Sequence, residues 1–313
     1  MKYIEYVNQR IREELARQDR AVVFGQNVNA GSCLGGLTRG LQSHGAVRVI
    51  NTPNIENAQV GFGFGLMING VSSAFFMKQQ DFLLLGIDHL VNTYNFVRQS
   101  PAQASFTIVT IVVDLGYQGM QSSLNNFGDF CSIARVPGYG ITNRHDADYV
   151  LSKHLFSKGF RIIGVSQRMF HDELIEFDTP VGEDQDGGIF HLTSGADATI
   201  VCFNFTLPQG KQLRRELMDM GKNCSLFGVA SAIPVGWDNI ITDIRRTGRA
   251  IVIEDSKSVN CCSHQFICSV HDVLPGTDVI YIRREPSEID LAPNSEIFTI
   301  NAESVYRQIE KVS

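Results

Sequence analysis

Short, continuous runs of apolar and β-branched residues recur along the first half of the chain, separated by longer amphipathic stretches. They occupy residues 21–24, 47–50, 71–77, 106–114, 138–142 and 161–165. Continuous rather than alternating hydrophobicity is typical of strands that are buried on both faces, as in parallel sheets covered by helices. The pattern therefore predicts an α/β fold with a mainly parallel sheet and helices on each side.

The alternation resumes after a polar, glycine-rich stretch at residues 180–188. The expected strands beyond it are 197–203, 223–229, 250–255 and 278–282, and the expected helices are 207–221, 238–247 and 262–273. A length of 313 residues also favours about two domains. We therefore predict two doubly wound domains, residues 1–185 and 186–313, the second built on a smaller sheet with right-handed crossovers.

Charge and cysteine usage narrow the class of protein. The formal net charge is −6, the pI is near 5.8, and basic residues gather only in pairs such as Arg214 and Arg215, which argues against nucleic acid as a partner. Seven cysteines are scattered without paired spacing, which is typical of a reduced, cytoplasmic protein. The first 18 residues read as a polar helix rather than a signal peptide, and no apolar run approaches the roughly 20 residues that cross a membrane.

Glu56 is the most informative single residue. It follows Pro53 by three positions and stands at the head of an otherwise apolar, glycine-spaced helical stretch within residues 51–67. A carboxyl group on a face that must pack is costly to desolvate. Glu56 is therefore expected to be paired, to be exposed at a cleft, or to be retained for chemistry.

Three glycines, Gly61, Gly63 and Gly65, lie in the same stretch. A dinucleotide-binding turn needs GxGxxG directly after a strand, and these glycines have neither that spacing nor that position. Each glycine costs a helix roughly 1 kcal/mol relative to alanine. The run therefore predicts a close helix contact, with another backbone or a ligand approaching this side of the helix.

Polar and aromatic residues follow three of the predicted strands at their carboxyl ends, where α/β sheets bind ligands. Phe82 follows the third strand, Gln121 and Ser122 follow the fourth, and His145 and Asp146 follow the fifth. Taken alone, each residue has an ordinary interpretation. Phe82 could be a core aromatic, Gln121 and Ser122 loop polar groups, and His145 and Asp146 helix caps.

Neither a phosphate site nor a metal site is evident in the sequence. The segment 186–188 (Asp-Gly-Gly) lacks a following helix with an asparagine at a suitable spacing. Cys261 and Cys262 are adjacent and are poorly placed to bind one ion together with His264. The sequence therefore predicts no metal ligands in this chain and vicinal buried thiols in a helix.

The order of five motifs resembles a known family. They are VVFGQNV (22–28), VINTPNIEN (49–57), KQQDFLLLGIDHLVN (78–92), DATIVCFN (197–204) and TGRAIVIED (247–255). Together they are similar to the beta subunit of the thiamine-diphosphate-dependent 2-oxoacid dehydrogenases and to the last two domains of transketolase. The resemblance implies a pyrimidine-binding domain of the thiamine-diphosphate fold, followed by a transketolase C-terminal-like domain.

The resemblance also implies roles for residues near Glu56. Glu56 matches the glutamate whose carboxyl group hydrogen-bonds the pyrimidine ring of thiamine diphosphate and activates the cofactor. Phe82 matches the aromatic residue that stacks on that ring, and Ile55 and Asp81 are expected beside the cofactor. Gln121 and His145 are weaker candidates, and we expect them to contact the substrate.

The motif that binds the cofactor's diphosphate and magnesium in these families, GDG followed by an asparagine, is missing. The resemblance therefore implies an alpha subunit that carries it, with an α2β2 assembly and the cofactor at the interface.

Residues 121–123 read Gln-Ser-Ser where the dehydrogenases have His-Ser-Gln. Gln26 stands where they tend to have an acid, and 260–263 replaces a glycine-rich turn. These departures favour a transketolase-like transfer of a two-carbon ketol or acyl unit, from a ketose or 2-oxo acid to an aldehyde. Two alternatives stay open: a dehydrogenase beta subunit that serves oxidative decarboxylation, and a degenerate, non-catalytic scaffold subunit.

Overall fold

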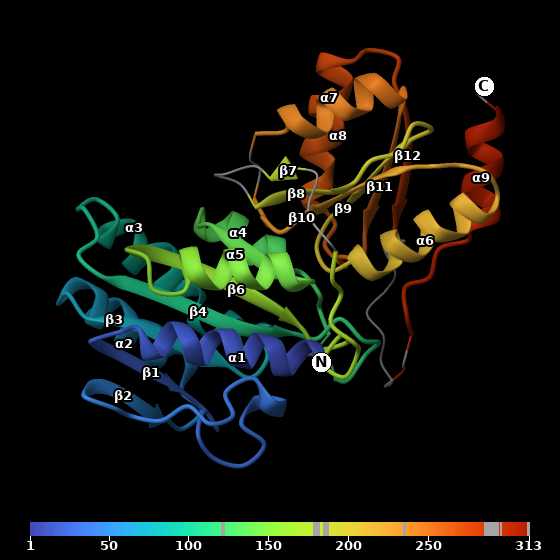
Figure 1. Cartoon of the computed structure of the whole chain (residues 1–313). Helices are drawn as coiled ribbons and strands as arrows, with labels where there is room; N and C mark the ends of the chain where they lie inside the picture. Colours follow the sequence, from blue (N-terminus) through green and yellow to red (C-terminus); the bar gives the residue numbers. More distant parts are fainter. Residues whose placement is uncertain are drawn as a thin grey trace.

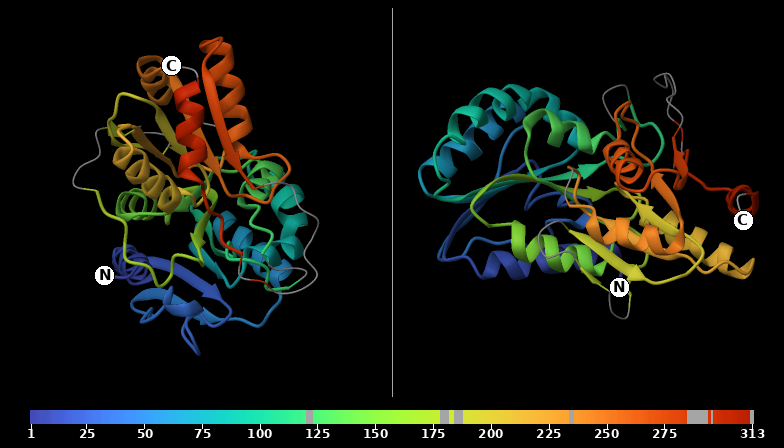
Figure 2. Two further views of the ribbon diagram at one scale, coloured as in Figure 1. Left: turned by 90° about the vertical axis from the view of Figure 1, so that its right-hand side faces the viewer. Right: turned by 90° about the horizontal axis from the view of Figure 1, so that it is seen from above.

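The chain folds into two lobes, each built on its own sheet. A computed structural model describes residues 1–119, 123–177, 182–183, 188–233, 236–284, 294 and 296–311. Figure 1 shows the first lobe in blue to green and the second in yellow to red, and Figure 2 shows the two lobes from two further sides. The predicted α/β class with two doubly wound domains is confirmed.

The first sheet has six parallel strands in the order β2-β1-β3-β4-β6-β5. The strands are β1 (Arg20–Gly25), β2 (Ala46–Asn51), β3 (Ser72–Met77), β4 (Ser105–Val112), β5 (Gly138–Ile141) and β6 (Gly159–Ser166). Each corresponds to one of the predicted runs. All eight residues of the central strand β4 are buried, as expected of a strand with helices on both of its faces.

Helices cover both faces of this sheet. One face carries α1 (Tyr3–Ala16) and α5 (Arg144–His154), and the other carries α2 (Glu56–Ile68), α3 (Tyr94–Val97) and α4 (Phe127–Ala134) (Figure 1). Short helical segments η1 (Leu34–Gly36), η2 (Gln80–Gly86) and η3 (His89–Thr93) lie in the connections. Alternate residues of β4 face opposite layers: Phe106 and Ile108 join the core beneath α2, and Val109 and Ile111 join the core beneath α1.

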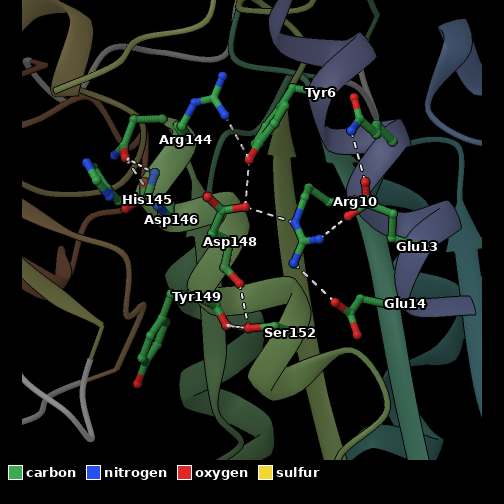
Figure 3. Close-up of polar contacts among 12 residues, drawn as sticks. Tyr6, Arg10, Glu13, Glu14, Arg144, His145, Asp146, Asp148, Tyr149 and Ser152 are labelled. Carbon is green, nitrogen blue, oxygen red and sulfur yellow. Dashed lines mark hydrogen bonds and ion pairs between the residues drawn. The ribbon is translucent and has the colours of Figure 1, made fainter. Parts of the chain in front are cut away.

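A polar network joins the two helices of the α1 layer (Figure 3). Arg10 pairs with Asp148 at 2.9 Å, and the hydroxyl of Tyr6 donates to the same carboxylate at 2.7 Å. The guanidinium of Arg144 lies 4.4 Å above the Tyr6 ring. These contacts fix the outer side of α1 against α5, far from the opposite face that carries α2.

The second sheet also has six strands, in the order β12-β11-β9-β10-β8-β7. They are β7 (Gly182–Glu183), β8 (Ile189–Thr193), β9 (Thr199–Cys202), β10 (Ser225–Val229), β11 (Arg249–Glu254) and β12 (Asp278–Arg283). The helices around it are α6 (Leu207–Asp219), α7 (Asp238–Thr247), α8 (Cys262–Val273) and α9 (Ala302–Lys311).

The structure departs from the expectations for this half in two ways. Within the described residues its sheet equals the first in strand number, because β8 joins β10 in antiparallel pairing and extends the sheet to β7. The helix α9 was not expected from the sequence. The expected domain boundary, between residues 185 and 186, lies outside the described residues and stays a prediction.

The two lobes pack through the carboxyl end of the second sheet. The amide of Gly140 in β5 donates to Ala230 at 2.7 Å, and the amide of Ala232 donates to Gly138 at 2.8 Å. Arg168, just after β6, pairs with Asp255, just after β11, at 2.9 Å. The edge of the second sheet where a ligand would ordinarily bind is therefore occupied by the first lobe.

Within the described residues, no helix is long and apolar enough to span a bilayer.

Candidate functional site

Glu56 is the first residue of α2, directly after the turn that follows β2. Gln59 is buried and fixes this turn, since its side-chain amide donates to the carbonyl of Pro53 at 3.0 Å and to the hydroxyl of Thr52. The side chain of Glu56 is half-buried, and it makes no hydrogen bond or ion pair with any residue that the structure describes. The structure therefore presents an open carboxyl group at a rigid helix start.

Phe82 lies in η2, which packs directly on the first turns of α2. A Cβ atom added to Gly86 would lie 2.7 Å from Val60, so glycine permits this close approach. The side chain of Asn57 donates to the carbonyl of Leu85 at 3.3 Å. The segment that carries the half-buried Phe82 is thus held against the helix turn that carries Glu56.

Asp81, the neighbour of Phe82, is only 1% exposed. Its Oδ2 accepts a hydrogen bond from the backbone amide of Ser123 at 3.0 Å. Burial raises the pKa of Asp81 from 3.8 to about 6, and hydrogen bonds from the amides of Ser123 and Leu124 and the charge of Lys257 oppose that rise. Its carboxyl group faces the loop after β4 rather than an open surface, so the expected contact with a cofactor stays a prediction.

The loop after β4 was expected to contribute Gln121. Gln121 and Ser122 lie outside the described residues, and Gln121 stays a prediction. The base of the loop is described: the amide of Gln118 donates to the hydroxyl of Ser123 at 2.9 Å. Through Ser123 and Asp81, this loop base is joined to η2.

His145 lies far from Glu56 within the chain. It follows β5 at one edge of the first sheet, whereas Glu56 follows β2 at the other edge, five strand spacings or about 24 Å away. Asn143, not His145 or Asp146, caps α5, since its side chain accepts from the amides of both residues. One small substrate could not contact Glu56 and His145 of the same chain together.

Two of the three glycines of α2 lie against neighbouring side chains. An added Cβ would lie 2.9 Å from Nε2 of His89 at Gly61 and 2.2 Å from the Phe106 ring at Gly63. Nothing lies within 4 Å of such an atom at Gly65. The expectation of close packing holds for the first two glycines, and its cause is the bulk of two neighbouring side chains.

Exposed apolar side chains lie in the segments next to Glu56. Ile55, which precedes it, is 50% exposed, and Leu84 and Leu85 of η2 are 44% and 55% exposed. Phe62, about two turns along α2, is 47% exposed. Several exposed apolar side chains in neighbouring segments are typical of a surface that another molecule covers.

The cysteines form no metal site in the described part of the chain, where no three His, Cys, Asp or Glu side chains cluster. Cys261 precedes α8, Cys262 begins it, and both are free thiols. Cys262 donates to the carbonyl of Ala232 at 2.6 Å. Burial raises the pKa of the Cys261 thiol to about 11, so this thiol is predominantly protonated at neutral pH.

The structure thus has two α/β lobes, with the half-buried side chain of Glu56 at one edge of the first. No family model matches the chain. Individual curated proteins do match the chain. The chain is 22% identical over 266 residues to the pyruvate dehydrogenase E1 component subunit beta of Acholeplasma laidlawii, and the match covers 81% of this chain and 79% of that protein. It is 24% identical over 269 residues to the 2-oxoisovalerate dehydrogenase subunit beta 2 of Arabidopsis thaliana, covering 82% and 73%.

A solved structure confirms the architecture. The inactive beta4 tetramer of a split-gene transketolase matches with a TM-score of 0.72 and 14% identity, over 98% of this chain and 96% of that one. The resemblance drawn from the sequence is therefore confirmed. The chain is related to the beta subunits of 2-oxo-acid dehydrogenase E1 components and shares the fold of a split transketolase subunit.

Two contributors to the site were missed by sequence reasoning. Gln59 fixes the turn before Glu56, and Ser123 joins the loop base to Asp81. A buried glutamine three residues after the acid was a readable signal, because a polar side chain on an apolar helix face needs partners. The contact between Asp81 and Ser123 left no local signal, since it joins positions 42 residues apart.

Proposed function

We propose that this chain is the pyrimidine-binding subunit of a split, thiamine-diphosphate-dependent enzyme. The observation that carries the proposal is the open carboxyl group of Glu56 at the start of α2, beside the segment that presents Phe82. A carboxyl group at a helix start, next to segments with exposed apolar side chains, fits an aminopyrimidine, whose ring nitrogen can share a proton with the carboxyl group and whose ring offers an apolar face. The similarity to E1 beta subunits supports this interpretation.

Each residue of the proposed site has a distinct task. Glu56 would hydrogen-bond the pyrimidine nitrogen and hold the proton at that position. Phe82 would stack on the ring and exclude water from one of its faces. Ile55 would add apolar contact next to the carboxyl group. When bound, the cofactor supplies the electron sink for cleaving a bond next to a carbonyl carbon.

A partner subunit completes the proposal. The GDG motif with its following asparagine, which binds the diphosphate and magnesium in the families that the chain resembles, is missing from the sequence, so the diphosphate and Mg²⁺ would be held mainly by an alpha subunit, in an α2β2 assembly. The exposed side chains of Ile55, Leu84 and Leu85 support docking of that subunit over the start of α2. The names of the relatives, as beta subunits, are consistent with such a partner.

For the reaction we propose transfer of a two-carbon ketol or acyl unit from a ketose or 2-oxo acid to an aldehyde. The sequence Gln-Ser-Ser at 121–123 favours this reaction. The dehydrogenase-type reaction is the second candidate, because the curated relatives are E1 subunits. Acylation of a lipoyl domain by the assembled enzyme would identify the second reaction, and ketol transfer without such acylation would identify the first.

The test is calorimetric titration of thiamine diphosphate and Mg²⁺ into the chain alone and into its complex with the alpha subunit. We expect binding only in the complex. Glu56→Gln should keep the assembly intact and lower turnover by about 10²-fold or more, the range typical of a lost proton-transfer group. Asp88→Asn, an exposed acid between η2 and η3, is the control and should retain wild-type turnover. Full activity in Glu56→Gln, or no binding in either state, would refute the proposal.

A further inference from the structure

The unexplained group next to the proposed site is the carboxyl group of Asp81. It is buried between η2 and the loop after β4, and it makes no ion pair among the described residues. An ionised carboxylate in such a place is costly, and the structure offsets the cost only with backbone amides. A neutral amide or a hydroxyl could accept the same hydrogen bonds, so the choice of a carboxylate requires a reason.

The contacts of Asp81 connect two parts of the proposed site. Its backbone is adjacent to Phe82, and its side chain accepts from the amide of Ser123 at 3.0 Å. Ser123 has φ of 73°, a left-handed conformation that is strained for a non-glycine residue and needs support from its surroundings. Ser123 also closes the loop base by accepting from the amide of Gln118 at 2.9 Å.

Neighbouring contacts extend the connection to the second lobe. Gln80 is fully buried and donates to the side chain of Asn126 at 2.9 Å. Asn125, with φ of 40°, donates to the carbonyl of Asp255 at 2.8 Å and accepts from Ser256 through its own carbonyl. The loop base is thus held on one side by η2 and on the other by the second lobe.

We propose that Asp81 is a positioning residue, which sets the loop base at Ser123 relative to Phe82 and so shapes the edge where the cofactor's ring and the substrate meet. This inference rests on the proposed function, and it assigns Asp81 no contact with the cofactor. The charged form is the one that acts, because the backbone amides donate to a carboxylate more strongly than to a neutral acid.

The charge state of Asp81 supplies a readout that a purely structural role would not change. Burial raises the pKa of Asp81 to about 6, and the charged side chain that acts on it is Lys257, whose ammonium group donates to the carbonyl of Gly116 at 3.3 Å. As pH falls through about 6, the carboxylate gains a proton and its hydrogen bond to Ser123 weakens. Asp81→Asn keeps an acceptor oxygen and removes this titration.

The experiment compares wild type, Asp81→Ala and Asp81→Asn, with Asp146→Asn as the matched control. Asp146, in the first turn of α5, is also a buried carboxylate with its pKa raised to about 6 by burial, but it accepts hydrogen bonds from Thr142, which follows the edge strand β5. Hydrogen exchange is measured at the Ser123 amide in the chain, and thiamine diphosphate affinity and kcat are measured in the complex between pH 5 and 8.

We expect Asp81→Ala to speed exchange at Ser123 at least tenfold and to weaken cofactor affinity or kcat at least tenfold. Asp81→Asn, which keeps an acceptor oxygen but no charge, should restore only part of both and should lack the change near pH 6 that wild type shows, whereas Asp146→Asn should behave as wild type. Unchanged exchange at Ser123 in Asp81→Ala would overturn the inference, as would wild-type affinity and kcat in that variant while Glu56→Gln is inactive. Wild-type activity in Glu56→Gln would instead refute the proposed function.

Discussion

Replacing Asp81 by asparagine should stabilise the protein at neutral pH. Burial raises the pKa of Asp81 from 3.8 to about 6. Each pKa unit corresponds to about 1.4 kcal/mol, so ionising this group costs the folded state about 3 kcal/mol relative to the unfolded chain. Between about pH 4 and pH 6 the folded state holds more protons than the unfolded state, and its stability therefore falls as pH rises. Asparagine stays neutral throughout and avoids that loss.

The assay is urea unfolding of wild type and Asp81→Asn, monitored by circular dichroism at several pH values from 4 to 8. The difference in unfolding free energy should be near zero at pH 4 and should reach about 3 kcal/mol in favour of the variant above pH 7. Glu173→Gln is a control of opposite sign, because the hydrogen bond from Lys2 lowers the pKa of Glu173, and the wild type should be favoured there as pH rises. A difference for Asp81→Asn that does not vary with pH would refute the reasoning.

Two further predictions concern packing. Gly63→Ala should lower the unfolding free energy by about 1–3 kcal/mol, because the new methyl group would lie 2.2 Å from the Phe106 ring. Gly65→Ala has open space around it and should raise the unfolding free energy by up to about 1 kcal/mol. Equal effects of the two substitutions in urea unfolding would contradict this prediction. Arg168→Met should cost about 3–5 kcal/mol by the same assay, because it leaves Asp114 and Asp255 buried without their shared cation. Arg307→Met, on an exposed helical pair, is its control, and a similar small effect in both variants would argue against the ion pair as a clamp between the lobes.

Burial on both faces explains why the first sheet could be predicted and parts of the second could not. The central strand β4 of the first sheet carries a continuous apolar run, because helices cover both of its sides, whereas the edge strand β2 is buried only at alternate residues. β8 is a five-residue antiparallel strand with a half-exposed alternation, and such a strand resembles a loop in sequence. In contrast, α9 had a readable signal, since its buried residues Val305 and Ile309 are four positions apart.

Some features of the candidate site could likewise be predicted from the sequence, and others could not. The placement of Glu56 at a helix start could be predicted from its apolar surroundings and from the resemblance. The distance between His145 and Glu56 could not, because it depends on the strand order, which places β5 after β6 at the far edge of the sheet. Strand order is decided by which faces can pack together, and no local sequence pattern records it.

The strand order and the packing of the lobes together locate the open edge of the molecule. In α/β sheets, ligands bind at the carboxyl ends of the strands. In the second sheet, the carboxyl ends of the strands are covered by β5 and by the ion pair between Arg168 and Asp255. In the first sheet, the segment after β4 is occupied too, since Tyr117 pairs with Asn294 through both backbone hydrogen bonds.

The carboxyl ends of β2, β1 and β3 lie toward the other edge of the first sheet, away from β5. Glu56 follows the first of these strands and Phe82 follows the last. Glu56 and Phe82, two of the residues that the resemblance implicates, therefore follow strands at the same side of the sheet. Asp81 joins the segment after β3, which carries Phe82, to the loop after β4, which contacts the second lobe. A residue that positions this loop relative to Phe82 would have to lie between these two segments.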